Sequence, residues 1–121
     1  MREIEFRAWD VLNNKMLNWG DIFHLPAWEI FPGTPEQRSF NIMQYTGMKD
    51  KNGREIYEGD IVKFISRLDD SKRMGTVRYW AGDAAFLIEC EREIFFLFHD
   101  ALNREVIGNI YENPEILKDR R

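Results

Sequence analysis

The chain has 121 residues, 44% of them hydrophobic and 31% charged, and a formal net charge of -4. This length favours one domain, and the acidic excess argues against bulk attraction to nucleic acid or to an anionic membrane. The single cysteine, Cys90, excludes an internal disulfide and a cysteine-rich zinc cluster. With an N-terminus that lacks the apolar core of a signal peptide, we expect a cytoplasmic protein.

The first third of the sequence predicts a hairpin and an irregular connector. Charged and apolar residues alternate in the first ten positions, and Asn13 and Asn14 mark a loop, so residues 3–20 predict a β-hairpin. Residues 21–38 hold three prolines and a glycine, which disfavour a long helix or a central strand. We expect residues 1–40 to form this hairpin and connector.

The remainder, residues 41–121, predicts a small barrel within the same single domain, 1–121. A strand over 39–47, the turn KDKNG at 49–53 and a short return strand precede a second turn, Glu58-Gly59-Asp60. Five strands follow, with a single 3₁₀ turn expected in HDALN, 99–103, and a short helix in NPEILK. The strands are expected at 61–65, 75–80, 84–91, 93–98 and 105–111. This order predicts a mainly β chain with an SH3-like barrel over about residues 59–111.

Side-chain alternation predicts which residues face the inside of the barrel. Val62, Phe64, Val77 and Tyr79 are expected to point inward. The segment EIFFLF, 93–98, does not alternate, because large apolar residues occupy both of its faces. We therefore expect both faces to be covered, the second by the N-terminal segment or by another subunit.

Residue types that support catalysis are sparse. The two histidines, His24 and His99, lie far apart without a cysteine cluster, and phosphate-binding and nucleophile motifs are absent from the sequence. Cys90 falls on an apolar face, which predicts an inert buried thiol, and Asp60 is interpreted as a carboxylate that fixes a turn. We expect neither an enzyme nor a bound metal or cofactor.

Basic residues around the first two barrel strands form a candidate binding surface. Small barrels bind nucleic acid with cations for phosphates and aromatic rings for stacking. Two acidic residues, Asp69 and Asp70, interrupt the cluster, and the net charge opposes this use. We call the candidate residues the basic strip: Lys63, Arg67, Lys72, Arg73, Arg78 and Trp80.

Three blocks of the sequence resemble a known family. They are EFRAWDVLNNKM (5–16), QYTGMKDKNGREIYEGDIVKF (44–64) and EVIGNIYENPEIL (105–117), and together they resemble the YopX-like proteins of phages and prophages of Gram-positive bacteria. The resemblance implies a mostly β protein with an SH3-type barrel, acting in the bacterial host's cytoplasm. It implies no activity and no catalytic or binding residues.

Two functions from different classes follow. The favoured one is a non-enzymatic protein-interaction module, an accessory phage or prophage protein whose partner is a second copy or a host or phage protein. The alternative is a nucleic-acid-binding accessory protein that uses the basic strip. An enzyme using Asp60, Cys90 or His99 is the least favoured reading.

Overall fold

The computed structural model describes residues 4–25 and 40–118, and in it the chain divides into two compact units. The units are Met1–Tyr45 and Thr46–Arg121. The single domain expected from the sequence stays a prediction. Most of the expected connector, residues 26–38, lies outside the described residues.

The first unit contains the predicted hairpin. Strands β1 (Phe6–Asp10) and β2 (Lys15–Leu17) pair antiparallel, which confirms the hairpin expected within residues 3–20. Its turn is fixed by Asp10, whose Oδ1 accepts the backbone N–H of Leu12 at 3.1 Å. Asn14 has a positive φ of 50°, a conformation that asparagine tolerates well.

A one-turn helix follows the hairpin. Helix α1 (Trp19–Ile22) begins with a capping box, in which Asp21 N donates to Asn18 Oδ1 and Asn18 N donates to Asp21 Oδ2. These reciprocal bonds satisfy amides that have no partner inside so short a helix. Ile22 is buried and packs with Ala8 in a small apolar cluster.

Strand β3 (Phe40–Lys49) follows, and it pairs with β1 over Phe40–Gln44. Within the four-stranded sheet the strand order is β2-β1-β3-β4, where β4 is Glu55–Tyr57. The predicted turn at 49–53 and the return strand are therefore confirmed.

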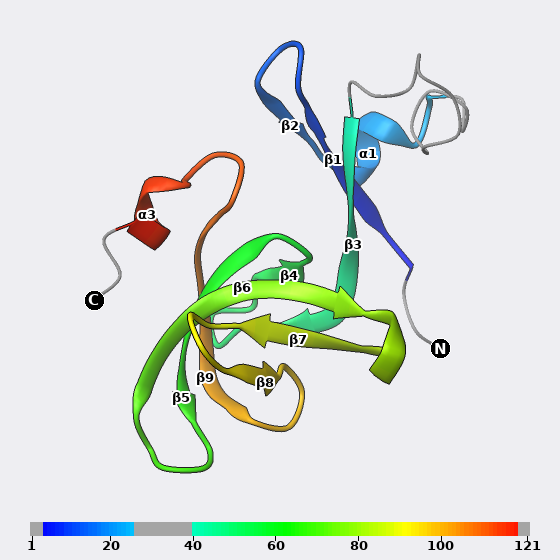
Figure 1. Ribbon diagram of the computed structural model, residues 1–121. Coiled ribbons are helices and arrows are strands. Elements are labelled where there is room, and N and C mark those ends of the chain that lie inside the picture. The colour runs from blue at the N-terminus through cyan, green and yellow to red at the C-terminus, as the bar shows by residue number, and fades with distance from the viewer. Residues whose placement is uncertain (1–3, 26–39, 119–121) are drawn as a thin grey trace. The chain divides into compact units, whose positions relative to one another are not determined.

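The second unit is built around a five-stranded antiparallel sheet that curls into a half-barrel (Figure 1). Its strand order is β8-β7-β6-β5-β9, a meander of four strands whose fifth strand returns beside the first. This order confirms the predicted SH3-like barrel. The strands are β5 (Asp60–Ser66), β6 (Lys72–Trp80), β7 (Ala85–Glu89), β8 (Ile94–Phe96) and β9 (Ala101–Asn109).

The turn over residues 49–54, which we call the acid turn, is organised by the buried carboxylate of Asp50. Its Oδ1 accepts the backbone N–H groups of Asn52 at 2.8 Å and Arg54 at 2.9 Å. Its Oδ2 accepts the N–H of Val106 in β9 at 2.9 Å. Burial acts to raise the pKa of Asp50, but these three amides hold its pKa below the usual value.

The second turn of the KDKNG…EGD segment also uses a carboxylate. Asp60 is fully buried, and its Oδ2 accepts the N–H of Tyr57 at 2.8 Å. Gly59 between them has a φ of 86°, which a residue with a Cβ adopts only at a cost. The geometry agrees with the interpretation of Asp60 as a carboxylate that fixes a turn.

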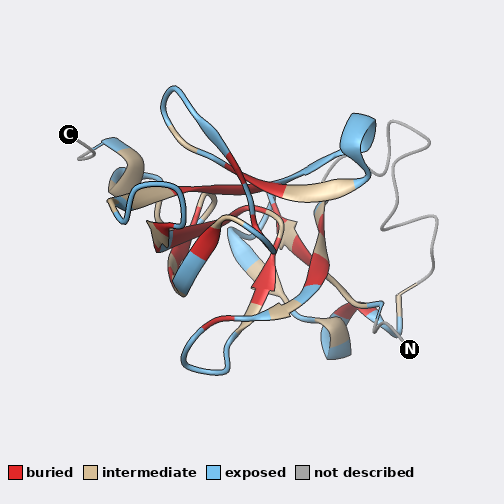
Figure 2. Ribbon diagram, turned by 90° about the horizontal axis from the view of Figure 1, so that it is seen from below, coloured by how far each residue is buried: buried red, intermediate tan, exposed pale blue. Residues whose placement is uncertain are grey.

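The barrel core is apolar and contiguous, and it includes Val62, Phe64 and Val77 as predicted. Buried positions, red in Figure 2, lie along the strands. Phe64 and Phe95 meet edge to face inside it, with ring centroids 5.2 Å apart. The inward orientation predicted for Tyr79 is wrong, because 46% of this residue is exposed. Tyr79 lies next to the end of β6, just before the 3₁₀ helix η2 (Ala81–Asp83), and its ring packs on Phe86.

The last elements differ in detail from the expectation. The predicted 3₁₀ turn at 99–103 is wrong, because β9 already begins at Ala101 and the turn occupies 97–100. There Asp100 N donates to Phe96 O, four residues back, a wider turn than a 3₁₀ bond allows. The short C-terminal helix is confirmed as α3 (Glu115–Lys118).

Candidate binding site

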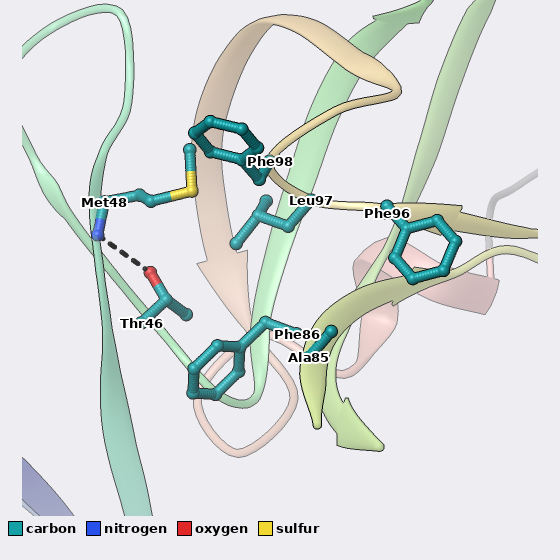
Figure 3. Close-up of a pocket in the computed structure, with 7 residues that line it drawn as sticks. All are labelled: Thr46, Met48, Ala85, Phe86, Phe96, Leu97 and Phe98. Carbon is teal, nitrogen blue, oxygen red and sulfur yellow. Dashed lines mark hydrogen bonds between the residues drawn. The ribbon is translucent and has the colours of Figure 1, made fainter. Parts of the chain in front are cut away.

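An apolar pocket of about 250 Å³ opens on the second unit (Figure 3). It lies among the end of β3, the start of β7, and the end of β8 with the turn that follows. The residues that line it are Thr46, Met48, Ala85, Phe86, Phe96, Leu97 and Phe98.

Thr46 is the one polar residue of the lining, and its hydroxyl makes hydrogen bonds with backbone groups of the protein. Thr46 Oγ1 donates to the carbonyl of Ile56 at 2.8 Å. It also accepts the N–H of Met48 at 3.2 Å (Figure 3). The rest of the lining is aliphatic, aromatic or thioether, and methionine adapts its shape easily to a ligand. The pocket therefore suits an apolar side chain rather than a sugar or a phosphate.

The rim of the pocket is formed by exposed aromatic rings. Leu97 is 1% exposed, whereas Phe98 is 79% and Phe96 44% exposed. Alternation along 93–98 places Phe95 and Leu97 in the core and leaves the other face open. Within the second unit, Ile94, Phe96 and Phe98 remain at the surface. Cover of this face by the N-terminal segment or by another subunit stays a prediction.

Residues 96–104, which we call the open turn, carry the pocket rim into β9. Asp100 holds the beginning of this turn, since its Oδ2 accepts the N–H of Phe96 at 3.1 Å. His99 Nδ1 lies 2.9 Å from Asp100 Oδ1. The hydrogen bond from His99 is the main cause that holds the pKa of Asp100 below its usual value.

Arg104 holds the other end of the open turn. Its Nη1 donates to the carbonyls of Leu97 at 3.1 Å and Ala101 at 2.9 Å. Its Nε is buried without a hydrogen-bond partner. Burial lowers the pKa of Arg104, and within residues 4–25 and 40–118 no carboxylate forms an ion pair with it. Sequence reasoning missed Arg104, because its position depends on the shape of the turn.

The strand register divides the basic strip between two faces. Lys63 in β5 is opposite Met74 in β6, and alternation along β6 places Lys72, Arg78 and Trp80 on the same face as Met74. Arg73 falls on the opposite face, where its guanidinium lies 5.6 Å from the ring centroid of Phe95. Arg67 lies in the turn after β5. Four of the six residues thus share one face.

Acidic groups accompany most of these cations. Arg73 pairs with Glu93 and, at 3.5 Å, with Asp69. Arg78 Nε lies 4.0 Å from Glu89, and Lys63 is opposite Glu105 in the sheet. These carboxylates reduce the positive potential available for phosphates. The basic strip as a binding surface stays a prediction.

The other residues considered for chemistry are not part of the pocket lining. Cys90 is half-buried against the barrel core, and His24 and His99 are exposed. In the part of the chain that the structure describes, His, Cys, Asp and Glu form no group of three or more that could hold a metal ion. In the same residues, no helix has the length and apolar character needed to cross a membrane.

Comparison with known proteins places the chain among similar structures. The protein EF1440 from Enterococcus faecalis is 25% identical, with a TM-score of 0.59 over 97% of this chain and 99% of that one. The YopX protein from Bacillus subtilis is 22% identical and shares the fold, with a TM-score of 0.62 over 100% of both chains. No curated protein matches the chain.

The match to a family model covers nearly the whole sequence. The model describes the YopX protein, and residues 5–118 match it. All three sequence blocks that carried the resemblance lie within that range. The chain belongs to the YopX family.

Proposed function

We propose that this protein is a non-enzymatic protein-interaction module that binds an apolar side chain of its partner in the pocket beside Phe98. The observation that carries the proposal is an apolar pocket whose rim exposes two phenylalanine rings, Phe96 and Phe98, to solvent. Aromatic side chains and methionine are enriched at protein interfaces, and exposed apolar patches mark such sites.

The proposal extends to the cellular setting, which the resemblance to proteins of phages and prophages supports. We take the protein as an accessory protein encoded by a phage or prophage, acting in the cytoplasm of the bacterial host without a cofactor. Its partner is a protein, either a second copy of this chain or a host or phage protein.

A selection of random displayed peptides on the immobilised protein tests this function. We expect the enriched peptides to share a bulky apolar residue and to lose at least tenfold in affinity for Phe98→Ser. Leu68→Ser is the matched control, because Leu68 is 77% exposed but lies away from the pocket lining. An absence of enriched peptides, or equal losses in the two variants, would contradict the proposal.

A second candidate function is binding of nucleic acid through the basic strip. The observation that favours it is the register that brings Lys63, Lys72, Arg78 and Trp80 to one sheet face. If it is correct, a titration of labelled single-stranded DNA at several salt concentrations gives binding that falls steeply with salt. The double variant Lys63→Glu, Arg78→Glu then weakens binding, while Lys15→Glu, Lys118→Glu, of equal charge change, leaves it nearly unchanged.

A further inference from the structure

The guanidinium of Arg104 lies against the backbone of a residue that lines the pocket. Its Nη1 is 3.1 Å from the carbonyl oxygen of Leu97, and the side chain of Leu97 lines the pocket. Leu97 therefore contacts the Arg104 guanidinium through its carbonyl and the pocket through its side chain.

This cation is incompletely satisfied by its own chain. Arg104 has five N–H donors in all, and within residues 4–25 and 40–118 its hydrogen bonds are the two from Nη1, both to neutral carbonyls. Its Nε is buried without a hydrogen-bond partner, and among the residues that the structure describes no carboxylate pairs with it. A partly buried charge that lacks a counter-ion is unfavourable, and a carboxylate supplied from outside relieves this cost.

Two other arginines of the barrel do have acidic partners. Arg73 pairs with Asp69 and Glu93, and Arg78 lies 4.0 Å from Glu89. The chain therefore places carboxylates beside these two arginines, whereas among the described residues none pairs with Arg104, which donates to the carbonyl of the pocket-lining Leu97. This charge pattern indicates the chemistry of the ligand as well as its apolar part.

We infer that the partner segment is a peptide in which a bulky apolar side chain enters the pocket and an adjacent carboxylate binds Arg104. The carboxylate belongs to the same residue as the apolar side chain, as at a peptide C-terminus, or to its neighbour in sequence. Arginine binds carboxylates through two parallel N–H···O bonds, which adds specificity to the apolar contact. The inference rests on the function proposed above and specifies the partner.

A pair of small probes separates the apolar contact from the charge. N-acetyl-phenylalanine carries a free carboxylate, and N-acetyl-phenylalaninamide has the same side chain without the charge. Each is titrated into the full chain labelled with ¹⁵N, and the amide shifts of Met48, Phe86 and Leu97 report binding in the pocket. We expect the acid to bind about tenfold more tightly than the amide, as one charge-assisted interaction provides.

Variants of arginine test the assignment to Arg104. In Arg104→Gln the acid and the amide should bind equally, whereas Arg92→Gln, an exposed residue with the same change of charge, should keep the preference. The wild-type comparison of acid with amide remains decisive if Arg104→Gln unfolds, because it needs no variant. Equal binding of the two probes to the wild type, with shifts in the pocket, overturns only the inference about Arg104.

Two further outcomes separate failure of the proposed function from failure of the inference about the peptide partner. If neither probe shifts the pocket amides, the pocket binds no apolar side chain of this kind, and both the function and the inference fail. If sedimentation shows a dimer that Phe98→Ser converts to a monomer, a second copy occupies the pocket and the peptide inference is overturned.

Discussion

The acid turn and the open turn both contact β9, but they differ in how completely the charged side chain of each turn is hydrogen-bonded. In the acid turn, the buried Asp50 carboxylate accepts three backbone N–H groups, and these hydrogen bonds stabilise its negative charge. In the open turn, Arg104 keeps a buried Nε without a hydrogen-bond partner, and Phe98 of the same turn is 79% exposed. The two turns even meet, since Lys51 N donates to the carbonyl of Arg104 at 2.8 Å.

This difference suggests a criterion that distinguishes residues that stabilise the fold from residues that are available to bind a partner. A charge whose hydrogen bonds are complete contributes to stability, and its removal should be felt by the folded state. A ring that is mostly exposed, such as that of Phe98, contributes little to the fold of the free protein. Removal of the Asp50 carboxylate should therefore destabilise the folded protein, and removal of the Phe98 ring should affect binding alone.

The largest effect is expected from Asp50→Ala. The change leaves three backbone amides without their acceptor, one of them, that of Val106, buried, so we expect a loss of about 3 kcal/mol in the free energy of unfolding. Urea denaturation followed by tryptophan fluorescence measures it. A loss below about 1 kcal/mol would show that the acid turn is not the stabilising element that its geometry indicates.

A smaller effect is expected from pH acting on the same carboxylate. The pKa of Asp50 in the folded protein is below the usual value of 3.8, so its contribution is present above that value and is lost as pH falls below it. The stability difference between the wild type and Asp50→Asn should therefore shrink between about pH 7 and about pH 3. A difference that stays constant over this range would show that the charge is not what the amides bind.

At the start of the open turn, Asp100→Asn is expected to reduce the stability less than Asp50→Ala does. In Asp100→Asn an amide oxygen replaces the carboxylate that accepts the N–H of Phe96, so the hydrogen bond weakens but remains. We expect a loss of about 1 kcal/mol and faster hydrogen exchange of the Phe96 amide. Unchanged exchange at Phe96 would contradict the role given to Asp100.

The smallest effect on stability is expected from Phe98→Ser. Since most of the ring is exposed, its removal should change the free energy of unfolding by less than about 0.5 kcal/mol, as in Leu68→Ser. Affinity for an apolar peptide should nevertheless fall at least tenfold in Phe98→Ser alone. If Phe98→Ser lost as much stability as Asp50→Ala, the Phe98 ring would contribute to the fold, and the difference proposed between the two turns would be contradicted.

Much of the fold could be predicted from local sequence, because turns are encoded by local chemistry. Asn14, Gly53 and Gly59 have the positive φ values that their turns require, and the alternation around Val62 and Val77 identifies the core face. The prediction for Tyr79 was wrong, because alternation does not say where along a strand the core ends. The turn after β8 was predicted too tight, because a bond from Asp100 N to Phe96 O leaves no mark in the sequence.

The candidate pocket could be predicted only in part. The lack of alternation in EIFFLF indicated an unusual segment, but the sequence could not say which of its rings stay exposed. The pocket also needs Thr46 and Met48 from β3, about 50 positions earlier, and this proximity results from the tertiary fold. Arg104 had no signal at all, since a single arginine in a strand is ordinary.

The first and last strands of the barrel, β5 and β9, are neighbours in the sheet although three strands separate them along the chain. The hairpins of the meander form from nearby residues, whereas β9 must close a long loop before it gains any contact. The bond from Val106 N to Asp50 spans 56 positions and forms only in that step. Closure by β9 should therefore be the slow step of folding, and the pocket rim becomes ordered only when the chain has completed it.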